Sequence, residues 1–170
     1  GIKMCESYNI QYKTNYKCLM PTNTFGPNDN YNALNSHFLP ALIKKVHDLK
    51  LNNKMELTLW GNGLAKREVI YVDDLADACI FFMKKSFSGT ILNIGTGKDF
   101  SIKQYAKIIL NQIIPKNKIK IKYDLSKPNG TPRKVLDIKL ANKYGWKPKT
   151  KLDEAITKTY KNFLENNKIV

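Results

Sequence analysis

One of the two histidines stands where a side chain could transfer protons. His37 follows Asn35 and Ser36 at the junction between a polar loop and the expected start of a helix. An imidazole titrates near neutral pH, so a histidine in a cleft at such a junction can accept or donate a proton. Taken alone, the position favours a capping or surface role over catalysis. His47 falls inside an amphipathic helical pattern, which indicates a structural or surface role.

A flat aromatic ring and a guanidinium flank one turn. Trp60 precedes Gly61-Asn62-Gly63, and Arg67 follows this turn. An indole can stack on a base or sugar, and a guanidinium with five donors can bind a diphosphate. The pair therefore suits a nucleotide diphosphate. A core tryptophan with a surface arginine remains an equally compatible alternative. The chain has 29 basic residues, of which only Arg67 and Arg133 are arginines, so we expect both to mark places that need a planar guanidinium.

Two further loops could bind phosphate. The Pro/Gly-containing segment 126–134 carries Lys127, Arg133 and Lys134, and a rigid basic loop of this kind fits phosphate binding, although an ordinary solvated loop is the alternative. Gly95-Thr96-Gly97 follows an expected strand, but Phe100 stands where a dinucleotide fingerprint needs its third glycine. A tight strand-to-helix turn explains this second segment better than a pyrophosphate loop.

Composition favours a folded, cytoplasmic protein. Hydrophobic residues make up 42% of 170 residues, enough for one core, and no apolar run reaches the roughly 20 residues that span a bilayer. The first residues lack a signal-peptide pattern, and three cysteines fit neither a disulfide framework nor a metal site. The net charge of +15 comes from lysines spread along the whole chain, which favours a solvated surface over nucleic-acid binding.

Hydrophobic periodicity predicts an α/β fold with some parallel sheet. The helical pattern over residues 1–16 has no capping residue before its first turn, which suggests a chain that begins inside a helix, with upstream protein missing. We expect a strand over 17–20, a loop over 21–30 and a capping box at Ser101 and Gln104. The remaining expected helices cover residues 38–49, 75–85, 102–113, a short segment ending at 144, and 152–165. The remaining expected strands cover 56–60, 68–72, 91–94 and 119–123, and a loop covers 124–134.

Several segments, taken in order, resemble the GDP-L-fucose synthases, a family of extended short-chain dehydrogenase/reductases. They are Gly1-Ile2-Lys3-Met4-Cys5-Glu6-Ser7-Tyr8-Asn9, Met20-Pro21-Thr22-Asn23, Gly26-Pro27-Asn28-Asp29-Asn30, Asn35-Ser36-His37, Trp60-Gly61, Arg67-Glu68, Val72-Asp73-Asp74 and residues 126–134. The resemblance covers essentially the whole chain. It implies the C-terminal part of a Rossmann-type parallel sheet plus a smaller α/β substrate-binding lobe, with the N-terminal cofactor-binding half missing from residues 1–170.

The resemblance also implies an activity. The family converts GDP-4-keto-6-deoxy-D-mannose to GDP-L-fucose by 3,5-epimerisation and NADPH-dependent 4-reduction. The family's glycine-rich NADP loop, catalytic Ser, Tyr-x-x-x-Lys motif and epimerisation Cys all lie upstream of this chain. We therefore expect the fragment alone to be inactive, and the whole enzyme to be a cytoplasmic homodimer that binds a GDP-sugar, with no metal, membrane or nucleic-acid partner.

Residue roles follow position by position from the same resemblance. His37 matches the general acid/base of epimerisation and also lies beside the nicotinamide of NADP. Pro21, Thr22, Asn23 and Thr24 match the loop that lines the cofactor. Substrate contacts are matched by five residues: Lys45, Trp60, Arg67, Lys120 and Lys134. Lys45 stands where the family often has arginine, so a compact ammonium replaces a planar guanidinium there.

Two other functions stay open at this stage. The chain could belong to another sugar-nucleotide epimerase, reductase or dehydratase of the same superfamily. It could also be a basic nucleic-acid-binding domain, but only two arginines are present and no nucleic-acid fold motif is recognisable.

Overall fold

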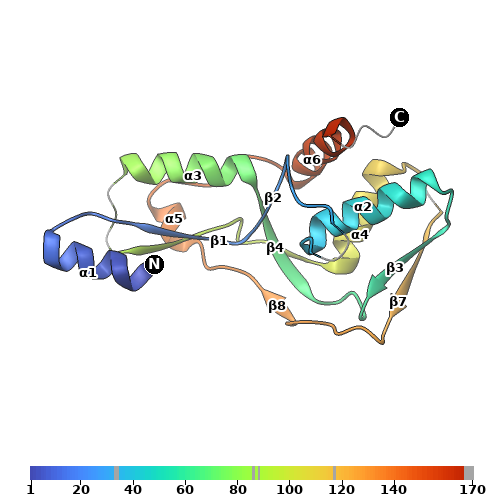
Figure 1. The fold of residues 1–170 in the computed structure, drawn as a ribbon, viewed down its shortest axis with the longest axis horizontal. Helices are drawn as coiled ribbons and strands as arrows, with labels where there is room; N and C mark the ends of the chain where they lie inside the picture. Colours follow the sequence, from blue (N-terminus) through green and yellow to red (C-terminus); the bar gives the residue numbers. More distant parts are fainter. Residues whose placement is uncertain (33–34, 86, 88, 117, 167–170) are drawn as a thin grey trace. The chain divides into compact units, whose positions relative to one another are not determined.

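The computed structural model is α/β and describes residues 1–32, 35–85, 87, 89–116 and 118–166 (Figure 1). Its helices are α1 (Ile2–Tyr12), α2 (Phe38–Leu51), α3 (Val72–Lys84), α4 (Ile102–Ile113), α5 (Lys139–Lys143) and α6 (Leu152–Asn166). Its strands are β1 (Cys18–Pro21), β2 (Asn23–Phe25), β3 (Glu56–Trp60), β4 (Lys66–Tyr71), β5 (Ile91–Ile94), β6 (Asp99–Ser101), β7 (Lys120–Asp124) and β8 (Arg133–Lys134). The chain divides into two compact units.

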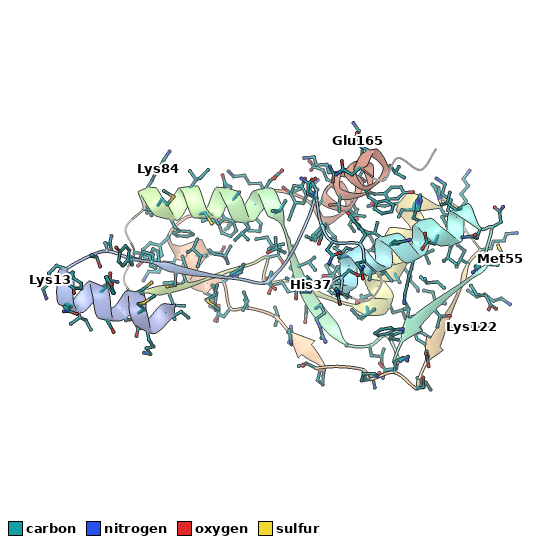
Figure 2. All side chains as sticks on the ribbon, viewed as in Figure 1. Lys13, His37, Met55, Lys84, Lys122 and Glu165 are labelled. Atoms are coloured by element: carbon teal, nitrogen blue, oxygen red, sulfur yellow. The ribbon has the colours of Figure 1, made fainter. Side chains whose placement is uncertain are left out.

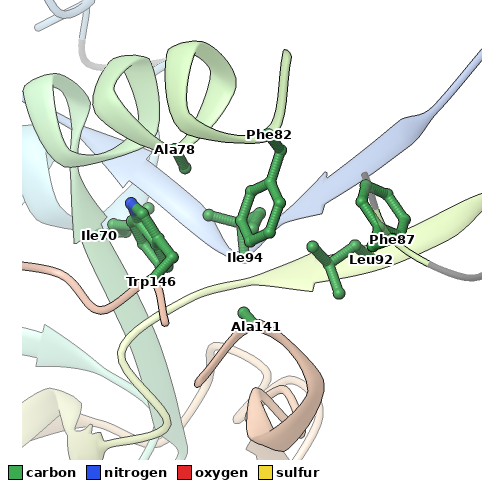
Figure 3. Packing of buried hydrophobic residues seen from close by; sticks show 8 residues of the cluster. All are labelled: Ile70, Ala78, Phe82, Phe87, Leu92, Ile94, Ala141 and Trp146. Carbon is green, nitrogen blue, oxygen red and sulfur yellow. The ribbon is translucent and has the colours of Figure 1, made fainter. Parts of the chain in front are cut away.

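Unit 1 comprises residues 1–24, 68–98 and 135–149. β1 and β5 pair in parallel, with Cys18 opposite Ile91 and Pro21 opposite Ile94, as the α/β pattern predicts. Figure 3 shows the core, where Phe82 on the buried face of α3 points toward Ile94 of β5. The whole core cluster consists of Ile70, Ala78, Phe82, Phe87, Leu92, Ile94, Ala141 and Trp146.

A buried carboxylate organises the turn after β5. Glu68 of β4 is 0% exposed, and its carboxylate accepts hydrogen bonds from the backbone N–H groups of Thr96 and Gly97, both at 2.6 Å, and of Leu136 at 2.7 Å. A Cβ at Gly95 would collide with the same carboxylate. Two turn amides that a pyrophosphate could have used are therefore already bound by the protein. The preference for a tight turn is confirmed, although the turn leads into β6 before α4 begins.

The described residues of unit 2 lie within 25–67, 99–134 and 150–166. The apolar faces of α2, α4 and α6 pack together, while β3 and β7 form a parallel pair (Figure 1). The capping box at the start of α4 is confirmed, because Gln104 N donates to Ser101 Oγ and Ser101 N donates to Gln104 Oε1. His47 is buried, and its Nδ1 lies 2.9 Å from the Tyr160 hydroxyl, so its role is structural.

The structure corrects the expected elements in three places. The first helix ends at Tyr12 rather than at residue 16, because Lys13 adopts the left-handed conformation with φ 56°. β2 and β8 lie inside segments expected to be loops, and β8 pairs in parallel with the start of β4. Among the described residues, no helix is long and apolar enough to cross a membrane.

Candidate functional site

Trp60 is the centre of a cluster of cations in unit 2. Alternation along β3 places Leu57 and Leu59 in the core and turns Trp60 outward, where it is 60% exposed. The Lys45 Nζ, from α2, lies 5.4 Å from the indole centroid, and the Lys127 Nζ, from the loop after β7, lies 5.8 Å from it. Both distances fall within the range of cation–π attraction.

The ammonium of Lys45 is partly desolvated. Its side chain is half-buried, and this burial lowers the pKa of its ammonium because the charged form loses solvent. The preceding residue, Lys44, pairs with Asp48 at 2.8 Å, whereas Lys45 makes no ion pair within the described part of the chain. A partly desolvated cation without a carboxylate partner is suited to binding an anionic ligand.

The loop that carries Lys127 is tied to the turn after Trp60. Asn62 N donates to Asn129 Oδ1 at 2.7 Å, and Gly61 N donates to the carbonyl of Asp124 at 2.9 Å. The Asp124 carboxylate accepts from Ser126 Oγ at 2.6 Å, and this hydrogen bond lowers the pKa of Asp124. These bonds fix both ends of the segment that places Lys127 beside the indole.

Arg67 extends the cluster along β4. Its Nη1 donates to the carbonyls of Lys66 at 2.7 Å and Thr131 at 2.6 Å, which orients the guanidinium. A Cβ added at Gly130, where φ is +69°, would lie 3.1 Å from Nη2. Arg67 also pairs in parallel register with Lys134 of β8, and neighbouring strands are about 4.8 Å apart. We call Lys45, Trp60, Arg67, Lys127 and Lys134 the Trp60 cluster.

Gly61 offers a test of how the loop is held. We expect Gly61→Ala to destabilise the protein by about 1–3 kcal/mol, because φ is +62° and the new Cβ would collide with Asn129. Gly145→Ala is the matched control, since its φ is +93° but nothing lies within 4 Å of the added Cβ. Urea unfolding of both variants measures the difference. Equal losses in both would mean that the close approach of Asn129 contributes nothing.

Arg133 does not join the cluster. Its Nε donates to Asp99 Oδ2 at 2.5 Å and its Nη2 to Asp99 Oδ1 at 3.3 Å, a two-point contact that lowers the pKa of Asp99 and raises that of Arg133. The planar fork is in use at Arg133, whereas Arg67 makes both of its hydrogen bonds through Nη1. At Arg133 the fork binds a carboxylate of the protein itself.

His37 stands at the N-cap position of α2, as expected from the sequence (Figure 2). Its imidazole is exposed and makes no capping hydrogen bond to the helix, so the capping alternative fails. Lys45 follows eight residues later on the same helix, about 12 Å along its axis. Among the described residues the ring has no hydrogen-bond partner and can contact a bound molecule, while its catalytic role stays a prediction.

The expected cofactor-lining residues follow β1 in unit 1. Pro21 ends the strand, and the side chains of Thr22 and Asn23 both donate to the carbonyl of Glu68, at 3.2 and 2.8 Å. Thr24 Oγ1 donates to the carbonyl of Thr22 at 3.3 Å. Both parallel strands of this unit end here, and open α/β sheets bind ligands at the carboxyl ends of their strands.

Lys120 is the expected contact that the structure does not bring to the cluster. It pairs with Glu56 at the start of β3, whereas Trp60 ends that strand and pairs with Asp124. Four residues of strand correspond to about 13 Å. A substrate role for Lys120 therefore requires a ligand that reaches along the β3–β7 pair.

Sequence reasoning missed the structural roles of two residues. Glu68 lies directly before the apolar run Val69-Ile70-Tyr71, and this position is a sequence signal of its burial. The Pro128-Asn129-Gly130 turn contains no sequence signal of the bond between Asn129 and Asn62. Within the described residues, no group of His, Cys, Asp and Glu could hold a metal ion.

Comparison with known proteins identifies the class. Residues 1–95 match the model of the NAD dependent epimerase/dehydratase family. The chain is 43% identical to a probable GDP-L-fucose synthase 1 of Oryza sativa subsp. japonica over 166 residues, which cover 98% of this chain and 50% of that protein. The chain belongs to the NAD dependent epimerase/dehydratase family.

Two further proteins are similar to this chain. The GDP-L-fucose synthase of Escherichia coli (strain K12) is 39% identical, with 98% of this chain and 54% of that protein covered. The solved structure of a GDP-D-glycero-L-gluco-heptose synthase from Campylobacter jejuni, in the presence of NADPH, superimposes with a TM-score of 0.81 at 31% identity, covering 96% of this chain and 57% of that one. The chain spans about half the length of the curated relatives it matches.

Proposed function

We propose that this chain is the substrate-binding part of a GDP-L-fucose synthase. In the whole protein, GDP-4-keto-6-deoxy-D-mannose would be epimerised at C3 and C5 and then reduced at C4. The Trp60 cluster carries the proposal, because its exposed indole and oriented guanidinium suit a nucleotide diphosphate. The two ammonium groups beside the indole make no ion pair with any described residue. The likeness to GDP-L-fucose synthases supports GDP as the nucleotide.

Each member of the cluster has a distinct binding role. Trp60 offers its exposed ring for stacking against the base or sugar. Arg67 has its Nη1 occupied by two carbonyls, so its remaining donors are available to a phosphate oxygen. Lys45, beside Trp60, and Lys134, opposite Arg67 on β8, add point charges. The ligand is thus oriented before any chemistry occurs.

His37 moves a proton in the proposed epimerisation. Inversion at carbon requires one group to remove a proton and another to deliver one from the opposite face of the sugar. His37 supplies one of the two, since its exposed imidazole is held at the start of α2 without an internal partner among the described residues. The resemblance places the second group, a cysteine, outside this chain.

The segment Pro21–Thr24 would line NADP, with His37 next to the nicotinamide. The fit rests on the carboxyl ends of β1 and β5, where ligands bind to parallel sheets. When bound, NADPH supplies the hydride for C4. Thr22 and Asn23 keep the segment's backbone fixed through their bonds to Glu68, and Asn23 Oδ1 remains available as an acceptor.

We infer that the whole enzyme is a cytoplasmic homodimer without nucleic-acid partners. α1 supports an interface, because none of its residues is buried and it exposes Met4, Tyr8, Ile10 and Tyr12. Size-exclusion chromatography with light scattering tests the dimer directly.

Arg67→Ala should weaken binding of a GDP-sugar to the full-length protein by about 2 kcal/mol, or roughly 30-fold, because a charge-assisted fork to the diphosphate is lost. Arg133→Ala is the matched control: it removes the chain's other arginine, whose fork binds Asp99. Calorimetry measures both affinities. Equal affinities for the two variants would reject Arg67 as a diphosphate ligand.

A further inference from the structure

We propose that Lys127 is a further phosphate-binding residue, and that it makes the Trp60 cluster select nucleoside diphosphates over monophosphates. The inference rests on the proposed function, since it concerns the same site. It adds a residue that neither the comparisons nor the resemblance assigns to the substrate, and it states what that residue discriminates.

The position of Lys127 is fixed before any ligand arrives. Its backbone N donates to the carbonyl of Asp124 at 3.2 Å, and the side chain of Asn129, two residues on, holds the loop to Asn62 at 2.7 Å. Both bonds attach the loop to the end of β7 or to the turn that follows Trp60. The backbone of such a segment loses little freedom when its lysine contacts an anion.

The ammonium of Lys127 is available. It forms no ion pair within the described residues, although it attracts the Asp124 carboxylate at longer range. The Asp124 carboxylate already accepts from both Ser126 N, at 3.1 Å, and Ser126 Oγ, at 2.6 Å. The attraction between an ammonium and an exposed indole is weak, so the ring positions Lys127 without competing strongly with a phosphate.

The cations of the Trp60 cluster are more numerous than a single phosphate group requires. Lys45 and Lys127 come from different elements, α2 and the loop after β7, and both ammonium groups lie within about 6 Å of one ring centroid. Arg67 lies beside Gly130 of the same loop. A single phosphate can be neutralised by Arg67 and one lysine, so the remaining cations, Lys127 among them, are left for the second phosphate of a diphosphate.

The test compares Lys127→Met with Lys122→Met in the full-length protein. Both changes remove one positive charge, but Lys122 lies on β7 and pairs with Glu56 at 2.7 Å (Figure 2). Calorimetry with GDP, GMP and inorganic pyrophosphate should give Lys127→Met about 10-fold weaker binding of GDP and pyrophosphate, with GMP binding changed less than about 3-fold. Lys122→Met should bind all three ligands as the unaltered protein does.

A second variant tests whether the loop must hold Lys127 in place for it to contact the phosphate. Asn129→Ala, which releases the loop from Asn62, should cause a similar loss for GDP, and the double variant should lose little more than either single one. If the unaltered protein binds GDP and Lys127→Met binds it equally well, or loses GMP affinity to the same extent, the inference is wrong while the proposed function stands. If the unaltered protein binds no GDP, the proposed function fails, and the inference fails with it.

Discussion

His37→Gln in the full-length protein should slow proton exchange at C3 and C5 by about 10²–10⁴-fold, while leaving the protein folded. Glutamine preserves size and hydrogen bonding but cannot titrate. The imidazole is exposed and makes no capping bond, so its replacement should leave the melting temperature nearly unchanged. The variant should still reduce the unepimerised keto sugar at C4, which gives the wrong stereoisomer.

Solvent-deuterium uptake into the GDP-sugar, followed by NMR, measures this step directly. His47→Gln is the contrasting change, because His47 is buried against Tyr160 and its loss should reduce stability rather than proton exchange in the molecules that remain folded. Normal deuterium uptake by a stable His37→Gln protein would return His37 to a structural or surface role.

Glu68→Gln should lower the free energy of unfolding by about 3 kcal/mol or more. The carboxylate is fully buried and accepts three backbone N–H bonds, from Thr96, Gly97 and Leu136. An amide of the same size presents one NH₂ group in place of an accepting oxygen, so at least one buried N–H group faces another donor. Hydrogen bonds to a buried charge each contribute roughly 1.5–3 kcal/mol.

Glu56→Gln provides the comparison for this prediction. Glu56 is an exposed glutamate on β3 with an ion pair to Lys122, and exposed pairs contribute at most about 1 kcal/mol. Urea unfolding of the two variants should therefore separate them clearly. Indistinguishable transition midpoints would show that the turn at Gly95-Thr96-Gly97 does not depend on the Glu68 carboxylate.

The sequence predicts the long helices well because their periodicity is local. α2 and α4 begin at the expected residues, and α4 even forms both bonds of its capping box. β2, β6 and β8 have only two or three residues each, and their strand conformation depends on partners that lie far away along the chain. Hydrophobic patterning carries no signal for such short elements.

The candidate site is predictable in its residue types but not in its connections. Trp60 and Arg67 could be selected because an indole and a guanidinium near one turn suit a nucleotide. The bond between Asn62 and Asn129, which links two loops 67 residues apart, could not be anticipated from either loop alone. The separation of Lys120 from Trp60 could not be anticipated either, because it follows from the parallel register of β3 with β7.

The central claim is that this chain provides the GDP-sugar site of a GDP-L-fucose synthase. Its most direct test supplies GDP-4-keto-6-deoxy-D-mannose and NADPH to the full-length protein and identifies the product by NMR. The account predicts GDP-L-fucose, formed with one NADPH oxidised per sugar, and no NADPH oxidation by residues 1–170 alone. A reduced sugar without inversion at C3 and C5, an unreacted substrate, or turnover by residues 1–170 alone would contradict it.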